Sequence, residues 1–138
     1  MRYGTTCEAT SRQQKDTALT TARAWVTFDP ARIRREVAAG RIVFVDVTAE
    51  WCITCQVNKR LVVDRGEVAE RLFGSPSVVP MRADWTRPDP VISAYLASFG
   101  CYGVPFNVVY GPGAPEGIPL PELLTEDAVL EALAKAAS

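Results

Sequence analysis

The feature that most constrains the fold of this chain is an apolar run followed directly by a Cys-x-x-Cys motif. Residues 42–47 read Ile-Val-Phe-Val-Asp-Val, and Cys52 and Cys55 come just after them. A nearly unbroken apolar run is typical of a strand that is buried on both faces, as in parallel pairing. The sequence therefore predicts a central strand, followed by a helix that begins at about Cys52 and carries Val57 and Leu61 inward.

Strand and helix signals alternate along the rest of the chain. Helix starts are predicted from N-cap residues, and helix ends from glycines that follow an apolar periodicity. The predicted strands cover residues 25–28, 42–47, 78–84 and 106–110, with a short edge strand near Ile118 and Leu120; the predicted helices begin near Asp29, Cys52, Glu67, Asp89 and Thr125. This alternation predicts an α/β fold with helices on both faces of the sheet.

Length and charge favour one soluble domain. The chain has 138 residues, and its 15 basic residues nearly cancel its 16 acidic ones. The resulting net charge of −1 gives no electrostatic reason to expect a nucleic-acid partner. The polar segment 1–23 is predicted to be a flexible leader or linker, and residues 24–138 to form the domain. We expect the domain to be monomeric, and it could be a piece of a larger exported protein.

The composition excludes several kinds of catalytic site. The chain contains no histidine, which rules out Ser-His-Asp and Cys-His catalysis within it, together with zinc sites that use imidazole. A zinc site of four thiolates would need Cys7 and Cys101 beside Cys52 and Cys55, and Cys7 lies in the predicted leader. We therefore expect no metal, with two unreactive core cysteines as a further alternative.

The position of the Cys-x-x-Cys motif has a physical logic. The partial positive charge and open N–H groups of a helix N-terminus stabilise a thiolate. Such settings lower the pKa of a cysteine from about 8.5 to about 3.5–7.5, and the thiolate is the nucleophile. We therefore predict that Cys52, expected to be the better exposed thiol, attacks a disulfide. Cys55, one turn later, resolves the mixed disulfide.

Several segments together resemble a known family. They are Phe44 to Cys55, Ala83-Asp84-Trp85-Thr86, Gly103-Val104-Pro105-Phe106 and Leu120 to Thr125. They are similar to the thioredoxin superfamily, and within it to the C-terminal periplasmic domain of the DsbD/ScsB family of transmembrane thiol:disulfide interchange proteins. The resemblance covers about residues 25–137. It implies a thioredoxin-like fold with a central mixed β-sheet.

The resemblance also implies a function. In this family the C-terminal domain takes electrons from a membrane domain and passes them to an extracytoplasmic partner. We therefore expect a periplasmic protein-disulfide reductase whose partners are protein thiols and disulfides, a transmembrane donor domain and a periplasmic acceptor domain. No cofactor is expected beyond the redox-active Cys52–Cys55 disulfide. The alternatives are a free cytoplasmic thioredoxin and a redox-inactive binding module.

The resemblance assigns roles to residues around the dithiol. It implies that Val104–Pro105 is a cis peptide facing the cysteines and that the Val104 backbone binds an extended substrate segment, with Trp51 beside it. It places Asp46 beneath the dithiol as acceptor of the Cys55 proton; the alternative is a strand-end acid that reaches solvent. If Asp46 is poorly solvated, Asp46→Asn should leave the fold as stable or more stable.

Several other residues near the dithiol each allow two interpretations. Glu50 is a second carboxylate at the site or simple surface charge. Cys101 is a third redox thiol or a free cysteine at a helix end, and Trp85 packs the core or lines the docking surface. Lys59 departs from the family, because many relatives carry a glutamate there, and a cation would favour the thiolate.

Overall fold

The computed structural model describes residues 25–138, so the predicted leader and Cys7 lie outside the described residues. Its core is a five-stranded sheet in the order β1-β3-β2-β4-β5. The strands are β1 (Val26–Thr27), β2 (Ile42–Thr48), β3 (Val78–Asp84), β4 (Phe106–Gly111) and β5 (Ala114–Pro119). β1, β3 and β2 run parallel, whereas β4 is antiparallel to β2 and β5 to β4, which confirms the predicted mixed sheet.

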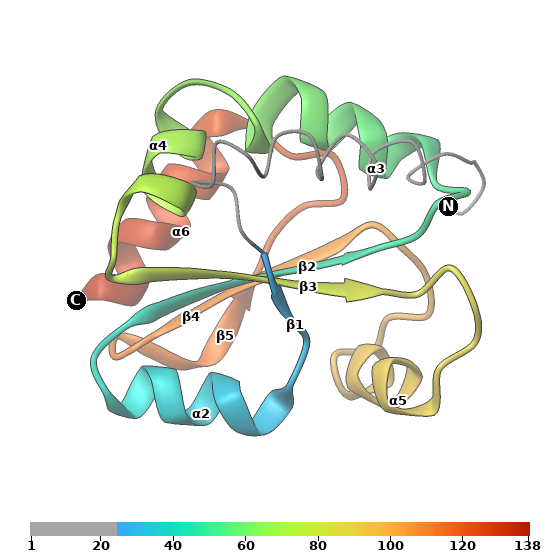
Figure 1. The fold of residues 1–138 in the computed structure, drawn as a ribbon, viewed down its shortest axis with the longest axis horizontal. Coiled ribbons are helices and arrows are strands. Elements are labelled where there is room, and N and C mark those ends of the chain that lie inside the picture. Colours follow the sequence, from blue (N-terminus) through green and yellow to red (C-terminus); the bar gives the residue numbers. More distant parts are fainter. Residues whose placement is uncertain (1–24) are drawn as a thin grey trace.

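Helices cover both faces of this sheet (Figure 1). They are α2 (Pro30–Ala38), α3 (Ile53–Asn58), the π-helical turn η2 (Lys59–Val63), α4 (Gly66–Gly74), α5 (Pro90–Ser98) and α6 (Glu126–Ala137). α2 and α5 lie on one face, and α3, α4 and α6 on the other. Within residues 25–138, no helix is long and apolar enough to cross a membrane.

Three of the predicted helix starts are confirmed by their capping bonds. The side chains of Asp29, Asp89 and Thr125 each accept a hydrogen bond from backbone N–H groups in the first turn of α2, α5 and α6. These bonds satisfy donors that have no partner inside the helix. Short-range side-chain chemistry therefore places three of the helix boundaries.

Strand β2 is the most enclosed element. It lies between β3 and β4, and all seven of its residues are buried. Val43, Val45 and Val47 belong to the apolar cluster that includes side chains of α2 and α5, whereas Phe44 packs with those of α4 and α6. The alternation follows from the two-residue period of a strand, and it puts Asp46 on the same face as Phe44.

The predicted orientation of the helix after Cys52 is wrong. Val57 and Leu61 are 37% and 56% exposed, whereas Cys55, Val62 and Val63 are buried. Val62 and Val63, seven and eight positions after Cys55, share its face of the helix, so the buried cysteine determines which face points to the core. A π-type bond from Asp64 N–H to the Lys59 carbonyl, 2.9 Å long, widens the last turn.

Two strand boundaries also differ from the prediction. β1 is shorter than residues 25–28, although Phe28 N–H still donates to the Arg82 carbonyl at 3.1 Å. β5 begins at Ala114, earlier than expected, and ends before Leu120. The β4–β5 turn packs closely on α6, since a Cβ at Gly111 would overlap the Ala136 carbonyl.

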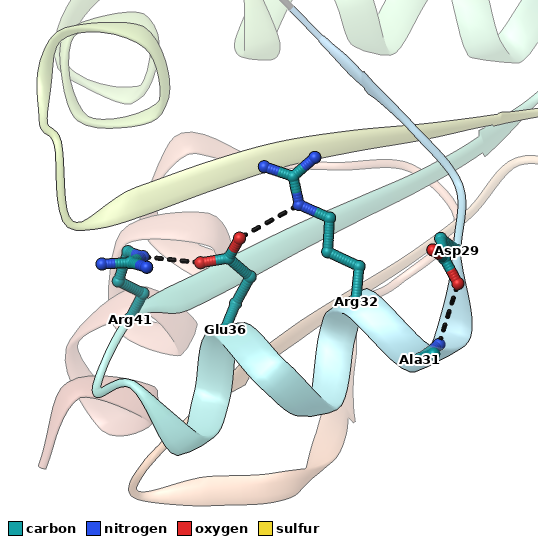
Figure 2. Close-up of polar contacts among 5 residues, drawn as sticks. All are labelled: Asp29, Ala31, Arg32, Glu36 and Arg41. Atoms are coloured by element: carbon teal, nitrogen blue, oxygen red, sulfur yellow. Dashed lines mark hydrogen bonds and ion pairs between the residues drawn. The ribbon is translucent and has the colours of Figure 1, made fainter.

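A charged cluster ties α2 to the start of β2. The Glu36 carboxylate accepts hydrogen bonds from Nε of Arg41 and from Nε of Arg32, the latter at 3.0 Å (Figure 2). Glu36 is buried, while the two arginines are partly exposed. The Arg41 hydrogen bond is the main cause that holds the pKa of Glu36 below its usual value, and Arg32 adds to it, against the opposing effect of burial.

We predict that Glu36→Gln makes the free energy of unfolding change less with pH in the acidic range. A carboxyl whose pKa is lower in the folded state stabilises the fold above its unfolded pKa, and this contribution disappears as pH falls through the folded pKa. At pH 7 the variant should lose only about 1 kcal/mol, because water around the partly exposed arginines screens their charges. The difference from wild type should shrink as the pH falls through the lowered folded pKa of Glu36, as measured by urea unfolding at several acidic pH values.

The matched control is Glu67→Gln, which removes the exposed pair with Arg71 on α4. It should change stability by only about 0.3–0.5 kcal/mol at pH 7, and by less at acidic pH. Equal pH profiles for the two variants would contradict the role given to Glu36.

Candidate active site

The dithiol lies where β2 gives way to α3, as the sequence predicts. Cys52 is the N-cap of α3 and is joined to Cys55 by a disulfide, with their Cα atoms 5.3 Å apart. The Cys55 N–H donates to the Cys52 Sγ at 3.0 Å. An amide donor at a helix N-terminus stabilises negative charge on that sulfur when the disulfide is reduced.

Exposure does not distinguish the two cysteines, which corrects the expectation that Cys52 is the more accessible. Cys52 is 1% exposed and Cys55 4%. Both belong to an apolar cluster that also contains Ala49 and Val104, with Trp51 packed against it. The two cysteines differ in the capping hydrogen bond. Within residues 25–138, the Cys52 sulfur accepts a backbone N–H and the Cys55 sulfur does not.

The loop before β4 meets the same cluster. The Val104–Pro105 peptide is cis, as predicted, and Val104 is buried in the cluster that holds both cysteines. Within residues 25–138, the backbone groups of residues 102–105 make no hydrogen bond to another residue. Tyr102, at the start of this loop, is 78% exposed. The loop therefore keeps backbone donors and acceptors available beside the dithiol.

An aromatic cavity of about 280 Å³ adjoins the motif. Its walls include Trp51, Trp85, Thr86, Tyr102 and Gly103. The Trp51 Nε1–H donates to the Thr86 carbonyl at 3.1 Å, and the Trp51 and Trp85 rings are 6.5 Å apart. Trp85 is thus part of the surface next to the dithiol.

Asp46 is buried and fully paired, so it is not a strand-end acid that reaches solvent. It is 6% exposed, and its carboxylate accepts from Arg82 Nε and Nη2 at 3.2 and 3.1 Å and from Asn107 Nδ2 at 2.9 Å. The Arg82 guanidinium lies 3.9 Å from the centroid of the Trp25 ring. This pairing compensates the charge that burial alone would leave unstable.

Sequence reasoning missed both partners of Asp46. Arg82 and Asn107 are the residues directly opposite Asp46 on β3 and β4. A polar residue in each of the neighbouring predicted strands was a visible signal, but choosing the partner requires the register of the sheet.

The auxiliary residues occupy different surroundings. The Glu50 N–H donates to Thr86 Oγ1 at 2.9 Å, which ties the motif to the segment after β3. Lys59 is buried at the start of η2. Cys101 carries a free, partly exposed thiol that packs against the cluster of the dithiol. Cys7 lies outside the described residues, and among residues 25–138 no three Cys, Asp or Glu side chains gather to hold a metal.

This arrangement of sheet, dithiol and proline loop agrees with the comparison to protein families. The thioredoxin-like family model matches residues 24–112. The chain belongs to this thioredoxin-like family. The thioredoxin-like fold predicted from the sequence resemblance is therefore confirmed, and the Cys52–Cys55 disulfide lies at a helix start within it.

Curated relatives point to one branch of the family. The chain is 33% identical over 78 residues to the thiol:disulfide interchange protein DsbD 1 of Pseudomonas aeruginosa, and 31% identical over 78 residues to DsbD of Ralstonia nicotianae. Each match covers 56% of this chain but only 13% and 12% of the relatives. The chain thus matches a small part of these longer proteins.

Solved structures share the fold. The oxidised C-terminal domain of Neisseria meningitidis DsbD superposes with a TM-score of 0.64 at 20% identity, covering 82% of this chain and 99% of that domain. A thioredoxin from Thermus thermophilus gives 0.58 at 21% identity, covering 80% and 85%. Both confirm the thioredoxin-like architecture.

We predict that Asp46→Asn lowers stability, which reverses the expectation from sequence. Without the carboxylate, the half-buried Arg82 guanidinium loses its counter-charge, and breaking such a pair costs about 3 kcal/mol. Asp46→Asn combined with Arg82→Met should recover part of this loss, because no charge is then left unpaired. Urea unfolding of both single variants and the double variant forms the test, and strictly additive losses would contradict the coupling.

Proposed function

We propose that this domain is a thiol–disulfide oxidoreductase that passes electrons from a membrane-embedded donor to an extracytoplasmic acceptor protein. The observation that carries the proposal is the Cys52–Cys55 disulfide at the start of α3, with Cys52 Sγ accepting the Cys55 N–H. The named function of the DsbD relatives, thiol:disulfide interchange, supports the same reaction class. The family's known location supports a periplasmic setting.

The reaction balances through two exchanges. In the reduced domain the Cys52 thiolate attacks a partner disulfide, which forms a mixed disulfide and releases one partner thiolate. Cys55 then loses its proton and attacks the Cys52 sulfur, which closes the Cys52–Cys55 disulfide and releases the second partner thiolate. Two electrons pass to the partner, and a donor dithiol restores the reduced domain by the reverse exchange.

Partner recognition is proposed to use the loop before β4. An extended segment of the partner can pair with the backbone of Val104, since residues 102–105 have no hydrogen-bond partner elsewhere in residues 25–138. The aromatic cavity beside Trp51 would receive a side chain next to the partner cysteine. Pro105 lacks an N–H and so leaves this segment outside the strand ladder.

We predict that Cys55→Ser accumulates a mixed disulfide with a protein substrate, whereas Cys52→Ser does not. The helix N-cap stabilises the thiolate of Cys52, so that sulfur attacks first, and without Cys55 the intermediate cannot be resolved. Pre-reduced variants freed of dithiothreitol are mixed with insulin, and non-reducing electrophoresis measures the trapped mixed disulfide. Insulin reduction with dithiothreitol as the electron source measures turnover separately. Trapping through Cys55 in the Cys52→Ser variant would reverse the assignment, and wild-type activity equal to that of Cys52→Ser would leave only a binding module.

We further propose that Asp46 accepts the Cys55 proton. Asp46 lies on the face of β2 that Phe44 shares with residues of η2, and α3 covers the same face of the sheet (Figure 1), which supports this role. Asp46→Asn should slow release of the mixed disulfide severalfold and leave the first attack by Cys52 nearly unchanged, because only the second step needs this base. Stopped-flow turnover at several pH values between 6 and 9 tests this, and unchanged release rates would show that Asp46 is only structural.

A further inference from the structure

An exposed apolar stripe runs along the active-site helix. Ile53, Val57 and Leu61 are spaced four residues apart and are 59%, 37% and 56% exposed. Residues at this spacing share one face of a helix, so the three side chains form a row about 12 Å long. We propose that this stripe docks the protein partner of disulfide exchange, and that the partner's contact face is apolar with a carboxylate opposite Arg60. The proposal rests on the proposed function.

The helix holds the stripe outward firmly. Its opposite side carries Cys55, Asn58 and Val62, all buried. Asn58 also fastens the segment before α6, because its Nδ2 donates to the Glu122 carbonyl at 2.9 Å and its Oδ1 accepts the Leu124 N–H at 3.0 Å. With these contacts in place, the helix cannot rotate to bury the stripe without breaking them.

One more exposed apolar side chain lies on the segment before α6. Leu123 lies between the two residues that Asn58 holds, and it is 60% exposed. Single exposed leucines are ordinary on a protein surface, whereas a row of them beside a reactive group marks an interaction site. Leu123 is therefore a further exposed apolar side chain on the segment that Asn58 fastens to the helix.

The position of Ile53 identifies the occupant. Ile53 directly follows Cys52 in the chain, so the first residue of the stripe adjoins the attacking cysteine. A partner seated on Val57 and Leu61 would therefore contact the dithiol in the same encounter. The exchange site and the stripe form one surface, which favours the exchange partner over an unrelated ligand.

Charge specifies the partner further. Residues 53–63 contain two cations, Lys59 and Arg60, and no acid. Lys59 is buried, whereas Arg60 is exposed and lies three residues after Val57, beside the stripe. A partner carboxylate at this point would be steered and held by Arg60. A second copy of this chain is disfavoured, because a two-fold contact centred on the stripe would bring two Arg60 side chains together.

The test uses synthetic peptides of defined sequence. Each peptide carries one cysteine joined to glutathione in a mixed disulfide, followed by an alanine-rich helix. One peptide has leucines four residues apart and a glutamate beside them; the second replaces the leucines with serine, and the third replaces the glutamate with lysine. Second-order rate constants for reduction by the reduced domain are divided by the rate constant for oxidised glutathione, which needs no docking surface.

Wild type should prefer the leucine–glutamate peptide over the serine peptide by about tenfold, and Val57→Ser combined with Leu61→Ser should remove this preference. Arg60→Glu should turn the preference for glutamate into one for lysine. Val91→Ser is the matched control, because Val91 is 57% exposed on α5, on the other face of the sheet. This variant should keep both preferences.

Other outcomes overturn the proposal. Equal ratios for all three peptides in wild type, with normal exchange of glutathione, would overturn the docking surface and leave the proposed function standing. Loss of preference in Val91→Ser as well as in the stripe variant would do the same. Self-association abolished by Val57→Ser and Leu61→Ser would assign the stripe to a second copy of the chain. No exchange even with glutathione would overturn the proposed function, and the docking surface with it.

Discussion

The complete burial of β2 is the constraint on which the rest of the structure depends. A strand with neighbours on both edges and helices on both faces has no access to water, so every polar group on it needs a partner. The backbone of β2 finds partners in β3 and β4, and the Asp46 carboxylate finds Arg82 and Asn107 on the same two strands. The same enclosure makes β2 a rigid base for the dithiol at its carboxyl end.

From that base, the disulfide orients the active-site helix. Cys52 caps α3 and Cys55 faces inward, which turns Val62 and Val63 into the core and leaves Ile53, Val57 and Leu61 outside. The π turn at Lys59–Val63 fits two adjacent valines into the buried face. One side of the helix therefore serves packing and redox chemistry, and the other is open to a partner.

Much of this arrangement was predictable because its signals are local. The apolar run of β2 and the caps Asp29, Asp89 and Thr125 depend on residues within a few positions of each other. The cis Val104–Pro105 peptide and the mixed sheet came from the family resemblance. The orientation of Val57 and Leu61 was mispredicted. This short helical segment also carries Val62 and Val63, and the sequence pattern does not show which of the two apolar pairs faces the core.

The sequence by itself determined the alternation of strands and helices and the place of Cys52 and Cys55 at a strand–helix junction. Only the tertiary structure decided which side of α3 is buried, how deeply Cys52 and Cys55 are buried and which side chains compensate the charge of Asp46. The partners of Asp46 lie 36 and 61 residues away along the chain. Cross-strand register brings them together, and register is set by the packing of the whole sheet rather than by any local pattern.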